Sequence, residues 1–156
     1  MASITPFLWF DGNAEEAIEF YASIFPDAKL GRVMRQEGKF FLGDFELAGQ
    51  KFTAINGGPQ FKFTEAISLY VECKDQAEVD RYWDSLLAGG GTPQQCGWLK
   101  DRFGLSWQII PEALPRLISD ADPKRAERAM KAMLQMVKID IAALEAAHRG
   151  ETIPAE

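Results

Sequence analysis

The chain has 156 residues and is poor in the features that mark several large classes of protein. It contains only two cysteines, Cys73 and Cys96, too few for the disulfide framework of a small secreted domain. No apolar run approaches the roughly 20 residues that a membrane-spanning helix needs. The first residues lack the basic region, apolar core and cleavage site of a secretory signal. We therefore expect a cytoplasmic protein with no membrane partner.

Basic residues and histidine are also scarce. The formal net charge is −6, because 23 Asp and Glu residues outnumber 17 Lys and Arg residues. Nucleic-acid binders usually carry a basic face, because phosphate contacts dominate their affinity, so we expect no nucleic-acid partner. The single histidine, His148, lies near the C-terminus. We expect it to be exposed in the last turn of a helix, where it complements the helix dipole.

A repeat organises the first 111 residues. Segments 13–25 and 75–87 both place apolar residues at helical spacing, and each begins with a candidate N-cap, Asn13 or Asp75. Glu16 and Glu78 follow three residues later, the spacing of a capping box. Each helix follows an extended stretch, and strand-like segments come after it: 29–36, 39–49 and 51–56 in the first half, and a compressed 94–110 in the second. The pattern predicts an α+β fold of two tandem β-α-β-β-β units that form a cup-shaped mixed sheet.

Strand alternation predicts which side chains line the cup. An apolar set, including Trp107, should lie under the helices, and a mixed set should face a cavity. We expect Gln108 in particular to face the cavity, with Ser106 on its side and Trp107 on the other. The candidate ligand-binding residues are Thr53, Ile55, Ser68, Tyr70, Cys96, Trp98, Ser106 and Gln108. No catalytic residue is predicted.

The remaining residues, 112–156, differ from both repeats. After a short turn of helix, Asp122 is a candidate N-cap, Pro123 suits the first helical position, and Gly150 suits the residue after the helix. We predict one long helix between them, with an apolar stripe that packs on the domain or on a second copy of the chain.

The tandem units resemble a known family. The segments "FDGNAEEAIEFY", "INGGPQFKFTEAISLYVEC", "CGWLKDRFGLSWQIIP" and "AMLQMVKIDIAALEAA" are similar to the vicinal oxygen chelate (glyoxalase/bleomycin resistance/dioxygenase) superfamily. Within it they resemble the PhnB-like branch, often labelled "3-demethylubiquinone-9 3-methyltransferase domain". The resemblance implies a homodimer. Members of the superfamily with known chemistry bind a divalent metal through His and Glu side chains of the first, fourth, fifth and eighth strands, so the resemblance also implies a metal site at these positions.

The metal ligands do not carry over to this sequence. The matching positions fall around Ile4 to Pro6, near Thr53, near Ala66 and on Gln108, where metal-binding relatives have Glu. A catalytic divalent ion needs about three strong protein ligands, usually imidazole or carboxylate. We therefore expect no metal and no other cofactor.

Other reactive candidates have ordinary structural alternatives. Cys96 could be a nucleophile, but no core histidine is available to activate it, and a structural thiol is the commoner case. Cys73 continues an apolar strand, and we expect it to lie in the hydrophobic core. Glu65 and Glu72 could be a general acid or base, although solvated carboxylates at strand edges are commoner.

The branch label invites a methyltransferase interpretation, which needs a Gly-rich loop between a strand and a helix. The run from Gly89 to Gly91 instead follows a helix, and Gly57 and Gly58 lead into a strand. We therefore predict a metal-free small-molecule binding protein. The alternatives are an enzyme of unassigned chemistry, such as a metal-dependent lyase, isomerase or oxygenase, and, less favoured, a methyltransferase.

Overall fold

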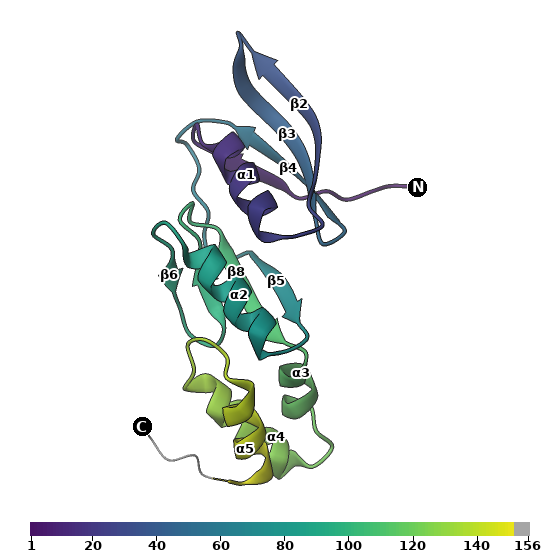
Figure 1. Cartoon of the computed structure of the whole chain (residues 1–156), viewed down its shortest axis with the longest axis vertical. Coiled ribbons are helices and arrows are strands. Elements are labelled where there is room, and N and C mark those ends of the chain that lie inside the picture. The colour runs from purple at the N-terminus through teal and green to yellow at the C-terminus, as the bar shows by residue number, and fades with distance from the viewer. Residues whose placement is uncertain (152–156) are drawn as a thin grey trace. The chain divides into compact units, whose positions relative to one another are not determined.

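The computed structural model describes residues 1–151. The chain divides between Phe63 and Thr64 into two compact units, called unit 1 and unit 2 below. Each unit contains one four-stranded mixed sheet and a helix that packs on one face of it (Figure 1). The predicted α+β fold with two tandem β-α-β-β-β units is confirmed.

Unit 1 has the strand order β1-β4-β3-β2, with β1 parallel to β4 and the other pairs antiparallel. Apolar side chains of the helix, among them Ala17 and Tyr21, are buried against the sheet, and Tyr21 stacks on Phe45. Its elements are β1 (Phe7–Phe10), α1 (Ala14–Ile24), β2 (Lys29–Gln36), β3 (Lys39–Leu47) and β4 (Gln50–Asn56).

The start of α1 is capped by a different residue from the one predicted. Asn13 makes no side-chain capping bond. The Oδ1 atom of Asn56 instead accepts a hydrogen bond from the Ala14 N–H at 2.9 Å. The parallel register sets Asn56 opposite Phe10, so the end of β4 lies beside the start of the helix. A tertiary contact thus satisfies a helix N–H group that a local side chain was expected to satisfy.

Unit 2 has the strand order β5-β8-β7-β6, with β5 parallel to β8. Here the predicted N-cap is confirmed: the Asp75 side chain accepts from the Glu78 N–H, and Glu78 in turn accepts from the Lys74 N–H. The elements of the repeat are β5 (Ser68–Cys73), α2 (Gln76–Leu87), β6 (Thr92–Pro93), β7 (Trp98–Lys100) and β8 (Ser106–Pro111).

Asp101 fixes the turn that leads into β8. It is 3% exposed, and its Oδ1 atom accepts hydrogen bonds from the N–H groups of Phe103 and Leu105. Its Oδ2 atom accepts from Trp107 Nε1 at 2.9 Å. Trp107 is thereby held on the buried face, and Gln108 points to the opposite one. The predicted register of this strand is confirmed.

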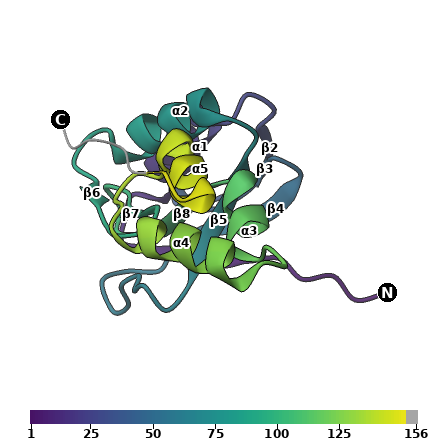
Figure 2. The ribbon, with the colours of Figure 1, turned by 90° about the horizontal axis from the view of Figure 1, so that it is seen from below.

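The prediction of one long tail helix is wrong. The segment forms α3 (Ala113–Ile118), α4 (Pro123–Leu134) and α5 (Ile141–Arg149), which pack on one another in unit 2 (Figure 2). Residues 135–140 leave the helical path, because the carbonyls of Met136 and Val137 accept from the N–H groups of Cys96 and Gly97. Ile139 is fully buried in this connector, and Asp140 caps α5. Residues 152–156, the end of the predicted tail, lie outside the described residues.

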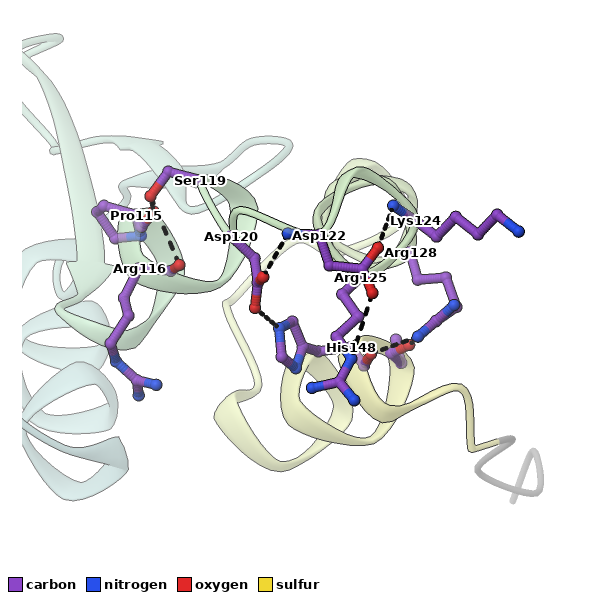
Figure 3. A network of polar contacts seen from close by, with 10 residues as sticks. Pro115, Arg116, Ser119, Asp120, Asp122, Lys124, Arg125, Arg128 and His148 are labelled. Carbon is purple, nitrogen blue, oxygen red and sulfur yellow. Dashed lines mark hydrogen bonds and ion pairs between the residues drawn. The ribbon is translucent and has the colours of Figure 1, made fainter.

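His148 is not exposed as predicted. Its side chain is 14% exposed, and Nε2 lies 2.7 Å from Oδ2 of Asp120, which precedes α4 (Figure 3). Arg128 of α4 donates hydrogen bonds to the carbonyls of Ala147 and His148, which lie in the last turn of α5 (Figure 3). Hydrogen bonds from the Asp122 N–H and from His148 lower the pKa of Asp120.

Within residues 1–151, no helix combines the length and the apolar composition needed to cross a membrane.

We predict that Asp101→Ala lowers the free energy of unfolding by about 2–4 kcal/mol, because three N–H donors, two of them buried, lose their side-chain acceptor. Chemical denaturation of the variant and the wild-type chain measures the change. Asp84→Ala, on the exposed side of α2, is the matched control and should stay within about 0.5 kcal/mol of wild type. Equal stability of the two variants would contradict the role assigned to Asp101.

Candidate functional site

Each sheet has an open face, the one opposite its helix. On the open face of unit 1, the strand register places Phe7 beside Thr53, Trp9 beside Ile55, and Asp44 on the other side of Thr53. Thr53 is 6% exposed and Ile55 is half-buried. The predicted residues Thr53 and Ile55 therefore share a face, and Asp44 joins them.

Asp44 is the centre of a polar network on this face. Its Oδ1 atom accepts a hydrogen bond from Thr53 Oγ1 at 2.7 Å, and its Oδ2 atom accepts one from Arg32 Nε at 3.1 Å. A groove of about 520 Å³ runs over the network, and its lining also includes Phe7 and Lys51. Sequence reasoning missed both Asp44 and Arg32. The alternation in segment 39–49 could have found Asp44, whereas the position of Arg32 depends on a β-bulge between Leu30 and Val33.

The open face of unit 2 brings together most of the other predicted residues. Ser68 pairs with Ser106 and Tyr70 pairs with Gln108 across β5 and β8, and Trp98 of β7 flanks Gln108 on the other side. Gln108 Nε2 donates to Ser68 Oγ at 2.9 Å. Tyr70 is 51% exposed, and partial burial, followed by the nearby charge of Glu72, raises the pKa of its hydroxyl.

Ser106 is the most buried member of this face. It is 0% exposed, and its Oγ atom has no hydrogen-bond partner within the part of the chain that the structure describes. Its neighbour in β7, Lys100, forms an ion pair with Glu65. The hydrogen bond from Lys100 is the main cause of the lowered pKa of Glu65, so this carboxyl group is ionised at neutral pH. A paired, ionised carboxylate does not suit the role of general acid.

Cys96 stands apart from the other candidates of unit 2. It has a positive φ of 58° in the loop before β7, and its N–H donates to the Met136 carbonyl of the tail connector at 2.8 Å. The carbonyl of the next residue, Gly97, accepts a hydrogen bond from the N–H of Ile109, near the end of β8. Cys96 therefore lies beside the connector, further along the sheet than the hydrogen-bonded pair of Ser68 and Gln108.

The residues at the positions of the relatives' metal ligands do not fit a divalent ion. Thr53 and Gln108 are neutral, and both already make side-chain hydrogen bonds. The other two positions, near Ile4 and Ala66, precede β1 and β5. Residues 4–6 offer no imidazole or carboxylate, and Glu65, beside Ala66, is paired with Lys100. Among residues 1–151, no group of three or more His, Cys, Asp or Glu side chains is placed to hold a metal. Divalent sites need about three such ligands.

Comparison with known proteins gives one family and one fold. A family model described as "3-demethylubiquinone-9 3-methyltransferase" matches residues 2–110. No curated protein matches the chain. Among solved structures, a PhnB protein of Bacillus cereus is 33% identical, with a TM-score of 0.65, over 70% of this chain and 99% of its own.

Two more distant structures share the fold. A glyoxalase/bleomycin resistance protein/dioxygenase domain of Frankia is 13% identical over 71% of this chain and 92% of its own, with a TM-score of 0.50. The fosfomycin resistance protein FosX of Listeria monocytogenes, described as a complex with Mn(II) and sulfate, is 16% identical over 74% of this chain and 94% of its own, with a TM-score of 0.54.

We predict that thiol reagents label Cys96 and spare Cys73 in the native protein. Cys73 is fully buried, and burial raises its pKa to about 12, so almost no reactive thiolate is present at pH 8. Peptide mass spectrometry after brief treatment with iodoacetamide measures the labelling, and both thiols should react in denaturant. Equal labelling of the two cysteines in the native chain would contradict the burial of Cys73.

Proposed function

Since the chain belongs to the 3-demethylubiquinone-9 3-methyltransferase family and has the fold of the vicinal oxygen chelate superfamily, we propose that it binds a small organic molecule without a metal ion. The observation that carries the proposal is the chemistry of Thr53 and Gln108. Both are neutral, and each is held in place by a hydrogen bond on the open face of its own sheet. Preorganised neutral groups suit the recognition of an organic ligand.

The open face of unit 2 supports this proposal. Gln108 uses one amide N–H on Ser68, which leaves its carbonyl oxygen to accept from a ligand. Tyr70 and Trp98 flank Gln108 and supply aromatic surface. Few, fixed polar groups beside aromatic walls are typical of ligand sites. A planar molecule with a hydrogen-bond donor matches this arrangement.

The enzyme alternatives have weaker support. FosX is described with Mn(II), but the positions of the metal ligands in this chain hold Thr and Gln, so we derive no metal-dependent step for it. A methyltransferase would need a cofactor loop between a strand and a helix. The only run of three glycines, from Gly89 to Gly91, follows α2 and leads into β6.

We also propose a homodimer in the cytoplasm. The family resemblance supports the dimer, as do exposed apolar side chains of the tail, Met130, Leu134 and Val137. Sedimentation equilibrium should give twice the mass of the chain, and a monomer at micromolar concentration would contradict the proposal.

We predict that a thermal-shift screen of chelator-treated protein finds stabilising planar compounds that carry hydrogen-bonding groups. A compound at 100 times its Kd adds about 2.7 kcal/mol, which raises Tm by several degrees. Gln108→Leu should weaken binding of such a compound roughly 2- to 10-fold, because one hydrogen bond is lost. Gln36→Leu, exposed in β2, is the control and should leave the binding unchanged.

Two results would contradict the proposed function. The first is a screen in which no organic compound raises Tm. The second is a rise in Tm on adding a divalent ion to the stripped protein, which would favour the metal-dependent enzyme.

A further inference from the structure

The groove of unit 1 carries a local excess of positive charge. Its lining holds the cations Lys29, Arg32 and Lys51 and the carboxylates Asp44 and Glu46. The chain as a whole has a net charge of −6, so the sign of this groove is opposite to that of the chain. Such a local reversal favours an anionic ligand at this place.

A β-bulge places Arg32 over the groove. Leu30 pairs with Phe45 and Val33 pairs with Gly43, so two residues of β2, Gly31 and Arg32, lie opposite Asp44 alone. Bulges redirect side chains and are common beside functional sites. Gly31 suits the close approach of the strands, because a Cβ atom there would lie 3.2 Å from the Cβ of Asp44.

Asp44 fixes the orientation of the Arg32 guanidinium group. It accepts the Nε–H, and its second oxygen is occupied by Thr53, which keeps the carboxylate in place. The two terminal nitrogens of Arg32 have no partner within residues 1–151. A guanidinium held through Nε presents these terminal N–H groups as a planar fork, which matches a carboxylate or phosphate in geometry and charge.

Two neighbours complete the site. Lys51 lies on the same face of β4 as Thr53, and it is exposed. Its ammonium group adds a second positive charge. Phe7, 57% exposed and paired in register with Thr53, offers apolar surface beside the polar network. The groove therefore combines a charged end and an apolar contact.

We propose that this groove binds a small organic anion, a carboxylate, phosphonate or phosphate attached to an apolar body, with Arg32 as the residue that holds the anionic group. The inference rests on the proposed function and names the class of its ligand. Asp44 is a positioning residue, because it acts through Arg32.

The experiment is a titration of the ¹⁵N-labelled full-length chain, followed by NMR, with phenylphosphonate, benzoate and the neutral analogue benzyl alcohol. The two anions should shift the amide signals of Gly31, Arg32 and Thr53, and benzyl alcohol should leave them in place. Arg32→Gln should weaken the binding of phenylphosphonate about tenfold or more, the effect of losing a charge-assisted pair.

Arg35→Gln is the matched control. It removes the same charge from the same strand, but Arg35 pairs with Glu15 of α1 rather than with a groove residue. It should leave the affinity for phenylphosphonate unchanged. Circular dichroism of both variants confirms that each is folded.

Asp44→Asn separates orientation from bulk charge. The substitution makes the groove more positive, so a groove that attracts anions only by its charge would bind phenylphosphonate more tightly. If Asp44 orients Arg32, the same substitution weakens binding.

The inference is overturned if Arg32→Gln behaves like Arg35→Gln, if Asp44→Asn binds more tightly, or if the anions shift amides of unit 2 alone. Binding of benzyl alcohol as tightly as benzoate would overturn the anionic class and leave the proposed function standing. If neither these compounds nor those of the thermal-shift screen bind, both proposals fail.

Discussion

In each unit one helix, α1 or α2, packs on one face of the four-stranded sheet and buries the apolar side chains of that face. In unit 2 the buried face holds Leu99, Trp107 and Ile109, each no more than 2% exposed. Burial of such a side chain contributes about 1.5–3 kcal/mol. A slip of one residue in β8 would exchange Trp107 and Ile109 for Ser106 and Gln108. The loss of about 3–6 kcal/mol is comparable with the whole stability of a marginally stable domain. The register is therefore fixed, and with it the set of polar side chains on the open face.

The burial of one face of each sheet also explains which features of the fold could be predicted from the sequence. Both repeats, the cap at Asp75 and the faces of β8 follow from local periodicity and from the spacing of capping residues, and all of them could be predicted. Features that depend on contacts between distant segments could not. Asn56 replaces Asn13 as the residue that binds the start of α1, because β4 ends beside that helix. The tail helix breaks because its backbone bonds to Cys96 and Gly97, although its apolar stripe continues.

In the candidate site, too, some positions follow from local alternation and others do not. Alternation placed Thr53 with Ile55, and Ser68 with Gln108, on the correct faces. Whether these residues bind a ligand stays a prediction. Arg32 could not have been found by alternation, because the bulge at Gly31 shifts the strand against Asp44. Strict alternation fails at a bulge, and such irregularities gather where strands serve a function.

The central claim is that the open faces recognise an organic ligand through neutral and cationic groups and do not hold a divalent metal. Thr53 and Gln108 are already committed to hydrogen bonds with neighbouring side chains. Crystals grown from protein purified without chelator, and soaked in manganese, provide the most direct test, by anomalous scattering. The account predicts no ordered anomalous peak beside Thr53 or Gln108. A manganese, zinc, nickel or iron ion coordinated by either residue would contradict it.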